Sequence, residues 1–488
     1  MSAAVRHREQ DEGESFPASD ATASIRRERL PVHVDPEHVF QALFGDERRA
    51  FWLDAGIHSD SGSSYLGAAS PTRPSYLVKS ERLCELRGDA RTLAGGSLVE
   101  ALRSWAPPAA VDAEEDAPIG WVGWFGYEYG ARLLGMAAAA SDSPDAAMLA
   151  ADRVVEVDHH DGGATLWYLD DDDGRAWAAA TAERLRSLAQ RECGSPDIAN
   201  DGMDEELPAI AEPTSQPRWR HSRHDYLGMI RACQAAIHAG DAYQVCLTNR
   251  VEVATQAVPF DVYRRLRRIS RAVHGAFLRV DDHTVLSASP ELFLRVAGGV
   301  AVTRPVKGTR RRGSDEAEDL ALARELAADE KERAENLMIV DLMRNDLGRI
   351  AAVGGVSVPE LLAVETHRHV HQLVSTVRAE LALGVDALDV VNACFPAGSM
   401  TGAPKTSAMG ILHGLEQGPR GIYSGCLGRL GLGGTAELAM VIRTIVMRNG
   451  VASVGTGGGI TALSVPENEV AETRLKAEAP LAALGLRP

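Results

Sequence analysis

One lysine stands in the segment Pro305-Val306-Lys307-Gly308-Thr309, directly before three arginines at 310–312. The glycine and the charges that follow it predict a tight turn between a strand and a charged helix. An amine becomes nucleophilic near neutral pH only if burial or neighbouring cations disfavour its charged form. The three arginines are such cations, which makes Lys307 a candidate nucleophile. The alternative is a solvated surface lysine, which is common beside turns.

Two further segments are suited to binding an anion. Arg443 lies in an apolar strand predicted at 439–443, where an unpaired guanidinium would be costly to bury, so we expect a partner for it. The run Gly457-Gly458-Gly459 lets backbone N–H groups approach an anion, because no side chain intervenes. A plain turn is the alternative for this run.

Five other segments accompany the lysine in a defined order along the chain. They are Gly240 to Val245, Ser289-Pro290-Glu291, Glu335 to Asp346, Thr401 to Lys405 and Glu472 to Lys476. With Tyr423-Ser424-Gly425 and the glycine run, this set resembles the chorismate-utilising enzymes over about residues 221–480. That family comprises anthranilate synthase component I, aminodeoxychorismate synthase component I, and isochorismate and salicylate synthases. The resemblance is closest to aminodeoxychorismate synthase component I.

The resemblance implies a Mg2+ site built from carboxylates. Glu335 and Glu472 match the metal ligands of the family, and Glu469, one helical turn before Glu472, is a candidate third ligand. Carboxylates on two separate helices can hold Mg2+, which prefers oxygen ligands and also bonds substrate oxygens. Glu472 and Lys476 are four residues apart, so an ordinary surface ion pair is the alternative for these two.

The resemblance also implies the contacts to the dianionic substrate chorismate. Arg443 matches an arginine that pairs with the pyruvyl carboxylate, beside a tyrosine that matches Tyr423. Glu291 corresponds to the general acid that protonates the departing C4 hydroxyl, and burial near the ring would keep it protonated. An exposed carboxylate at a strand edge is the alternative for Glu291. The other expected substrate contacts are Gly308, Thr309, Gly457, Gly458, Gly459 and Lys476.

Three positions select among the reactions of the family. Gln244 stands where isochorismate and salicylate synthases have a lysine base, whereas Lys307 and Asn336 match the lysine and asparagine of aminodeoxychorismate synthases. Anthranilate synthases have alanine and histidine at those two positions. We therefore expect Lys307 to attack C2 with loss of the C4 hydroxyl, after which ammonia adds at C4 and expels the lysine. The product would be 4-amino-4-deoxychorismate, for p-aminobenzoate and folate synthesis.

Two alternatives to this function stay open: an enzyme like anthranilate synthase component I, and a non-catalytic chorismate-binding regulatory subunit. The nitrogen source is expected to be a separate glutamine amidotransferase subunit that delivers ammonia. The segment around Cys426 faintly resembles the cysteine turn of glutaminases, but no His-x-Glu pair follows it. The six cysteines show no Cys-x-x-Cys pair and are expected to be reduced and mostly buried.

Composition argues against two other classes of partner. A net charge of -17 over 488 residues disfavours a nucleic-acid surface. The basic run at 264–271 is expected to be the solvated face of a helix over 259–271. The polar amino terminus has no apolar signal segment, and no stretch reaches the roughly 18 apolar residues of a membrane span, so we expect a cytoplasmic protein without membrane contact.

Hydrophobic periodicity and turn residues predict an α+β fold. Strands joined by short Gly or Asp turns indicate antiparallel pairing, and the resemblance implies two large facing antiparallel sheets flanked by helices, with the active site in a cleft between them. Predicted strands lie at 51–53, 119–125, 164–169, 244–253, 275–281, 284–296, 299–303, 423–432, 435–448 and 450–456. Predicted helices lie at 97–105, 176–191, 225–239, 314–335, 386–393, 403–415 and 467–478.

Composition shifts divide the chain into four expected segments. Residues 1–30 are polar and charged without periodicity, which predicts a disordered head. Residues 31–192 are expected to form an amino-terminal α+β domain, and 193–220 a linker or surface loop. Residues 221–488 are expected to form the chorismate-binding catalytic domain.

Overall fold

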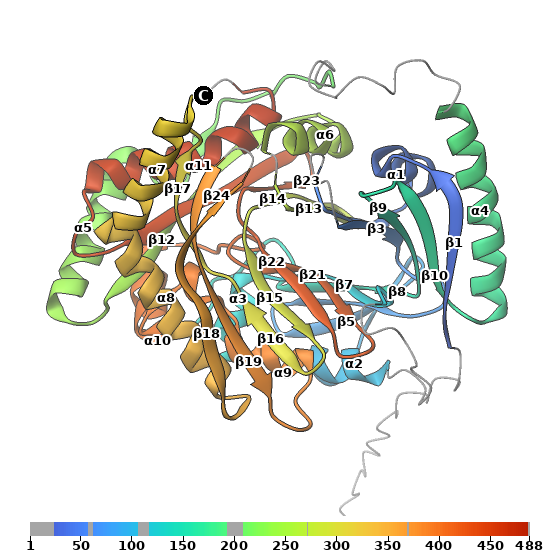
Figure 1. The fold of residues 1–488 in the computed structure, drawn as a ribbon, viewed down its shortest axis with the longest axis horizontal. Coiled ribbons are helices and arrows are strands. Elements are labelled where there is room, and N and C mark those ends of the chain that lie inside the picture. Colours follow the sequence, from blue (N-terminus) through green and yellow to red (C-terminus); the bar gives the residue numbers. More distant parts are fainter. Residues whose placement is uncertain are drawn as a thin grey trace, which may run out of the picture.

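The computed structural model describes residues 24–56, 62–105, 117–192, 208–270, 272–367 and 370–486. In this part of the chain, two large antiparallel sheets of twelve strands face each other, as predicted (Figure 1). Sheet A contains, in spatial order, β1 (Ile25–His33), β10 (Gly163–Leu169), β9 (Arg153–Asp158), β3 (Ser63–Ala68), β2 (Arg49–Asp54), β13 (His274–Val280), β14 (His283–Ser289), β23 (Thr444–Arg448), β24 (Val451–Ile460), β12 (Gln244–Ala254) and β11 (Arg218–Trp219), with β20 (Gly402–Ala403) beside β12. Sheet B contains β17 (Val306–Arg311), β19 (Val370–Leu381), β16 (Val300–Thr303), β15 (Leu292–Ala297), β22 (Ala436–Met440), β21 (Cys426–Gly431), β7 (Gly120–Phe125), β8 (Ala146–Ala151), β4 (Ser75–Lys79), β5 (Arg82–Arg87) and β6 (Ala90–Leu93), with β18 (Ala351–Thr366) beside β19.

Helices cover the outer faces of both sheets. They are α1 (Pro36–Phe44), α2 (Leu98–Ser104), α3 (Tyr127–Leu133), α4 (Asp172–Glu192), α5 (Arg223–Ala239), α6 (Pro259–Ser270), α7 (Glu316–Ala328), α8 (Glu330–Gly348), α9 (Ala387–Cys394), α10 (Lys405–Glu416) and α11 (Pro466–Ala483). Helices α1, α4, α6 and α11 pack on sheet A, while α7 and α8 pack on the β17, β18 and β19 end of sheet B (Figure 1). None of the helices in the described ranges is long and apolar enough to span a bilayer.

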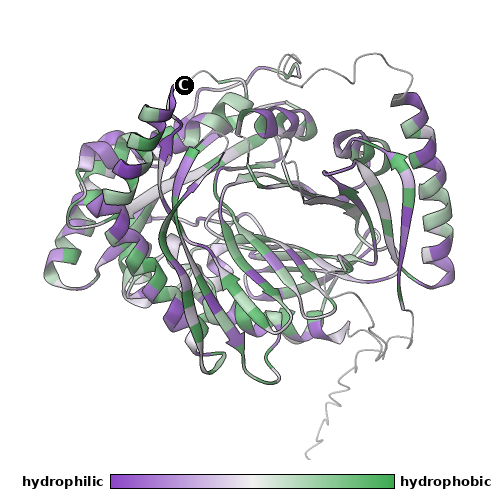
Figure 2. Ribbon diagram, viewed as in Figure 1, coloured by the Kyte–Doolittle hydropathy of each residue, from purple (hydrophilic) through white to green (hydrophobic). Residues whose placement is uncertain are grey.

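The main hydrophobic core fills the space between the two sheets. Leu278 and Val285 of sheet A belong to the same buried cluster as Trp124 and Leu294 of sheet B. Figure 2 shows the corresponding pattern, with hydrophobic residues along the central strands and hydrophilic residues along the outer sides of the helices. A second cluster, which includes Phe40, lies between sheet A and its helices. The central strands of sheet A, such as β13 and β14, therefore bury both faces.

Of the places at which the chain passes from one sheet to the other, two lie side by side: the first crossing, from β14 to β15, and the second crossing, from β22 to β23. The prediction of single strands at 284–296 and 435–448 was wrong, because each run divides into one strand of sheet A and one of sheet B. Strand β14 pairs with β23 in sheet A, and β15 pairs with β22 in sheet B, so the two crossings lie side by side. Most residues of both runs are buried on either side of the crossing, and hydropathy therefore does not mark the crossing.

Other boundaries near the predicted site also differ from the prediction. The helix predicted at 314–335 is two helices, because Asp329 ends α7 and caps α8 by accepting the N–H of Glu332 at 3.0 Å. The long pair β18 and β19 was missed. Helix α5, by contrast, lies within two residues of its prediction, with Ser222 as its N-cap and a left-handed Gly240 after its end.

Both sheets run continuously between the two parts of the chain that were predicted as domains. Strand β2 pairs with β13 in sheet A, and β7 pairs with β21 in sheet B. Strand β1 begins at Ile25, inside the segment predicted to be a disordered head. The remainder of that head, and residues 193–207 of the predicted linker, lie outside the described residues.

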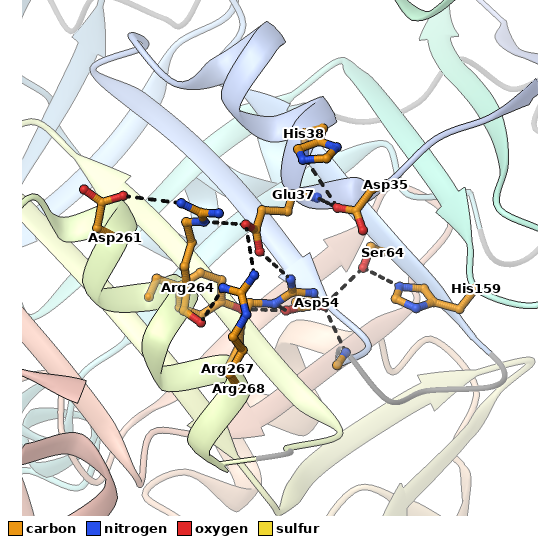
Figure 3. A network of polar contacts seen from close by, with 12 residues as sticks. Asp35, Glu37, His38, Asp54, Ser64, His159, Asp261, Arg264, Arg267 and Arg268 are labelled. Carbon is orange, nitrogen blue, oxygen red and sulfur yellow. Dashed lines mark hydrogen bonds and ion pairs between the residues drawn. The ribbon is translucent and has the colours of Figure 1, made fainter. Parts of the chain in front are cut away.

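A buried polar network, the arginine network, also joins the two parts (Figure 3). Arg267 of α6 donates from Nε to Asp54 of β2 at 2.9 Å and from Nη1 to Glu37 of α1 at 2.9 Å. Arg264 also binds Glu37, and Arg268 lies 3.7 Å from it. The prediction that this basic run is a solvated helix face was wrong. Helix α6 turns these arginines toward two buried carboxylates that come from distant sequence.

Candidate active site

A cavity of about 410 Å³ lies where the two crossings meet β17, β24, α8 and α11. Twelve of the predicted site residues line it, and they are Glu291, Lys307, Gly308, Thr309, Glu335, Tyr423, Arg443, Gly457, Gly458, Gly459, Glu472 and Lys476. Glu469 is buried directly behind the lining. Glu291 and Lys476, which are 185 positions apart in sequence, therefore meet in one site.

Lys307 lies in strand β17, so the predicted position in a tight turn was wrong. Its neighbour Gly308 has φ +80° and sits in a bulge, since Lys307 pairs with Leu373 and Thr309 with Gln372. The positive φ favours glycine at this position, and a Cβ atom there would also lie 2.7 Å from Leu326 Cδ1, which would have to move. The bulge places Lys307 in the cavity, with a side chain that is only 16% exposed.

The charges around Lys307 also differ from the prediction. The three arginines bind carboxylates elsewhere: Arg310 binds Glu325 and Asp329, Arg311 binds Glu318, and Arg312 binds Asp319. Lys307 Nζ instead lies 3.6 Å from Glu335 Oε2. Burial lowers the pKa of Lys307, but Glu335 and more distant acidic groups, including Glu291, more than offset this effect and raise the pKa above its usual range. The predicted activation of Lys307 by these three arginines was therefore wrong.

Glu291 lies in the crossing from β14 to β15, directly after Pro290. Its side chain is buried, so the alternative of an exposed edge carboxylate was wrong. Burial raises the pKa of Glu291, although the Lys307 charge and hydrogen bonds from Ser399 and the Val306 N–H oppose that rise. A buried carboxyl with a raised pKa beside a lysine is suited to general acid catalysis.

Arg443 lies in the second crossing, between β22 and β23, so the predicted position within a strand was wrong. It has φ +52°, a conformation stabilised by the pairing of β22 and β23 on either side. Its Nη1 donates to the Lys476 carbonyl oxygen at 3.2 Å, which leaves other N–H groups directed at the cavity it lines. Burial lowers the pKa of Arg443. A carboxylate ligand would satisfy this guanidinium.

Tyr423 lies beside Arg443 and packs on strand β24. A Cβ atom on Gly455 would lie 2.1 Å from Tyr423 Cγ, so the ring covers the bare backbone of that glycine. Burial raises the pKa of Tyr423 well above its usual range, so its hydroxyl stays protonated. The pair Tyr423 and Arg443 thus presents uncharged and charged donors to one part of the cavity.

The glycine run lies inside strand β24, so the alternative of a plain turn was wrong. Gly457, Gly458 and Gly459 pair with Thr248, Leu247 and Cys246 of β12. A Cβ atom on Gly458 would lie 3.4 Å from Glu469 Oε2 and 3.7 Å from Glu472 Oε1, and one on Gly459 would lie 3.2 Å from Glu335 Oε2. The run therefore leaves space beside all three predicted metal ligands.

The carboxylates that surround this space come from α8 and α11, and lysines neutralise part of their charge. Lys476 Nζ lies 2.6 Å from Glu472 Oε1, so the predicted i,i+4 ion pair is present, but inside the cavity lining. Among the described residues, Glu469 Oε2 is buried without a hydrogen-bond partner. No cluster of three potential metal-ligating side chains is already assembled in these parts of the chain. An oxygen-preferring cation nevertheless fits this donor set, because it would satisfy an orphaned carboxylate oxygen.

Sequence reasoning missed several lining residues. Lys331 of α8 lines the cavity, and Ser399 and Met400 enter it from the 3₁₀ turn Gly398–Met400. A signal for Lys331 was present, since the chain has only five lysines, namely Lys79, Lys307, Lys331, Lys405 and Lys476. Three of these five line one cavity. The turn at Ser399 carried no such signal.

Two positions that selected among reactions are buried near the cavity and are not among its lining residues. Asn336 is fully buried, accepts the hydroxyl of Ser375 at 2.5 Å and donates to the Pro305 carbonyl at 3.3 Å. It therefore supports the start of β17, which carries Lys307. Gln244 is buried beside Gly459.

The described cysteines are free and buried, as predicted, and Cys193 lies outside the described residues. Cys426 begins strand β21, and burial raises the pKa of its thiol. A thiol of this kind is not activated as a nucleophile, which agrees with the rejection of a glutaminase turn at this position.

Comparison with known proteins agrees with this arrangement. The chain is 41% identical over 483 residues to an aminodeoxychorismate synthase of Streptomyces pristinaespiralis, covering 95% of this chain and 66% of that protein. It is 36% identical to anthranilate synthase component 1 of Mycolicibacterium smegmatis, covering 94% of this chain and 90% of that protein. The chain thus spans about two thirds of the length of the aminodeoxychorismate synthase it matches.

A solved structure of anthranilate synthase component I from Streptococcus pneumoniae TIGR4 superposes with a TM-score of 0.70 at 26% identity. The superposition covers 93% of this chain and 99% of that one. The model of the chorismate binding enzyme family matches residues 65–482, a range that contains every residue lining the cavity. On this match, and on the relative covered over 90% of its length, the chain belongs to the chorismate binding enzyme family.

Proposed function

We propose that this chain converts chorismate and ammonia into 4-amino-4-deoxychorismate through a covalent intermediate on Lys307. The observation that carries the proposal is the shared burial of Lys307 and Glu291 in one cavity, with the amine and the acid influencing each other's pKa. The relatives at 41% and 42% identity, both aminodeoxychorismate synthases, support it. We also propose residues 221–488 as the catalytic region, since the lining residues fall between Cys246 and Lys476.

In the first step, the neutral amine of Lys307 attacks C2 of the ring. The ring electrons shift, the bond from C4 to its hydroxyl breaks, and protonated Glu291 donates its proton so that water leaves. Lys307 is then a secondary ammonium bonded to C2, and Glu291 is a carboxylate. Arg443 and Tyr423 hold a substrate carboxylate during this step, which keeps C2 within reach of Lys307.

In the second step, ammonia attacks C4 and the electrons shift back. The bond between C2 and Lys307 breaks, and the lysine leaves as a neutral amine. The new ammonium at C4 gives one proton to the Glu291 carboxylate, which restores the acid. The sum is chorismate plus ammonia giving 4-amino-4-deoxychorismate plus water.

We propose that Glu335 and Glu472 hold Mg2+, with Glu469 as a third ligand. When bound, the cation would neutralise the Glu335 charge that now raises the pKa of Lys307, and would polarise substrate oxygens. The free space beside the glycine run and the orphaned Glu469 oxygen support this assignment.

We propose that a glutamine amidotransferase on a separate chain supplies the ammonia. Cys426, the cysteine whose flanking residues resemble a glutaminase turn, is a buried, unactivated thiol, so glutamine hydrolysis is assigned elsewhere. A reducing cytoplasm fits the free thiols of the described cysteines.

The anthranilate-type alternative is disfavoured by Lys307, because those enzymes carry alanine at the matching position. The regulatory-subunit alternative is disfavoured by the convergence of a buried amine, a buried acid and three carboxylates on one cavity. A buried carboxyl with a raised pKa that shares a cavity with a buried amine is typical of catalytic sites.

The test uses the whole chain with chorismate and Mg2+ but without ammonia. A covalent adduct should accumulate on Lys307, and peptide mass spectrometry should find it there and not on Lys79. Lys307→Ala should remove both the adduct and the formation of 4-amino-4-deoxychorismate from added ammonium. An alanine variant that makes the product at the normal rate would refute the nucleophile.

A further inference from the structure

Lysine is rare in this chain, yet three lysines that line the cavity lie beside the three proposed metal-binding glutamates. Lys and Arg together number 51, of which five are lysines. Elsewhere, buried ion pairs are formed by arginines such as Arg267 and Arg420, and in one case by Lys405, which pairs with Asp346. A compact ammonium exchanges partners more readily than a planar guanidinium, which binds a carboxylate with two parallel donors. Three lysines in one partly open cavity are therefore suited to ion pairs that exchange partners.

Lys331 has no role in the mechanism above, but it occupies the central position in this cluster. Its Nζ donates to Glu469 Oε1 at 2.8 Å and lies 3.7 Å from Glu335 Oε1. These two carboxylates are on different helices, and their side chains are 2% and 7% exposed, whereas that of Lys331 is 34% exposed. The ammonium therefore bridges two buried carboxylates from the solvent side.

We infer that Lys331 is a built-in counter-cation, which holds the metal-binding carboxylates in the free protein and leaves them when Mg2+ binds. This inference rests on the proposed metal site. The bridge lowers the repulsion between Glu335 and Glu469 before metal arrives. The other oxygen of Glu469, which has no partner within the described ranges, stays open for the metal.

The displaced ammonium has a partner available in the same cavity. Lys331 lies in the first turn of α8, and its exposed side chain can turn into the cavity that it lines. The substrate is a dianion, and one carboxylate is assigned to Arg443. Lys331 then binds the second carboxylate, so that metal binding frees a cation that substrate binding uses. Metal and chorismate are therefore expected to bind with positive coupling.

The experiment measures Mn2+ binding to the whole chain by electron paramagnetic resonance and calorimetry, with and without chorismate. Lys331→Met keeps an unbranched side chain of similar length and removes the charge. It should bind Mn2+ about tenfold more tightly than the parent in the absence of chorismate, because one charged hydrogen bond no longer competes. The increase in Mn2+ affinity caused by chorismate should be smaller in this variant, and the KM for chorismate should rise.

Two controls make the result decisive. Lys79→Met, at a lysine outside the cavity, should bind Mn2+ like the parent, and Lys331→Gln provides a second uncharged variant if the methionine variant unfolds. Unchanged or weaker Mn2+ binding in folded Lys331→Met would overturn the inference. A parent that bound no Mn2+ would overturn the metal site as well, while the covalent adduct on Lys307 would still test the reaction.

Discussion

The cavity and the arginine network both bury carboxylates, but they neutralise them differently. In the network, Arg267 and Tyr263 bind one oxygen of Asp54, and Ser64 and the Gly56 N–H bind the other. In the cavity, Glu469 is bound through one oxygen, by Lys331. Residues already in the fold satisfy the first carboxylate completely, whereas the second keeps an oxygen for a ligand.

This difference separates a structural site from a binding site of similar charge. Arg267 also stacks on Trp52, with its guanidinium carbon 4.5 Å from the ring centroid, so its position is held by packing as well. Lys331 has no comparable packing among the described contacts and is partly exposed. Complete satisfaction favours rigidity, and incomplete satisfaction favours exchange of partners.

The largest expected effect is on stability, in the arginine network. Arg267→Met leaves Asp54 and Glu37 buried without their main cation, which should lower the free energy of unfolding by about 3–5 kcal/mol. The free energy of unfolding is measured by urea denaturation, with circular dichroism as the signal. The matched control is Arg103→Met, because Arg103 pairs with Asp386 and Asp389 at 44% exposure and should cost at most about 1 kcal/mol. Equal losses in the two variants would contradict a structural role specific to Arg267.

The next effect is on activity, in the cavity. Glu335→Gln and Glu472→Gln keep the shape of the side chain but remove the charge, and should lower turnover with chorismate, ammonium and Mg2+ by about 100-fold or more. The free energy of unfolding should change little, since repulsion among the carboxylates is relieved. The control is Asp341→Asn, which lies on α8 like Glu335 but has a side chain that is 83% exposed. This variant should keep full turnover. Full activity of both glutamine variants would exclude these carboxylates as metal ligands.

The smallest expected effect is a difference in the pH dependence of stability. Burial raises the pKa of Asp54 and Glu37, but the Arg267 charge, together with hydrogen bonds to Asp54 and the other arginines beside Glu37, more than offsets this effect, so both pKa values are lowered. The stabilisation that these two ionised carboxylates contribute is therefore complete above their unfolded-state pKa of about 4, and it is lost as the pH falls through their folded-state pKa. The stability gap between parent and Arg267→Met should narrow as the pH is lowered below about 4. A gap that widened on acidification would contradict the lowered pKa values.

Much of this molecule could be predicted from local sequence. Helix α5 and strand β12 lie within two residues of their predicted positions, because amphipathic spacing, a Ser222 cap and Gly240 are local features. The ordered motifs predicted both the facing sheets and the site, and twelve of the thirteen site residues line the cavity. Residue type and order along the chain were sufficient for these conclusions.

Tertiary structure decided the surroundings of those residues. Lys307 was expected beside cations, but the bulge at Gly308 turns it toward Glu335, while its neighbouring arginines bind α7 and Asp329. The crossings that carry Glu291 and Arg443 were hidden inside predicted single strands, since the chain is mostly buried on both sides of each crossing. The arginines of α6 were expected in solvent because their partners, Glu37 and Asp54, lie more than 200 residues away. Sequence by itself determined which groups could react, and only the fold decided which charges face them, because electrostatic neighbours depend on distance in space and not along the chain.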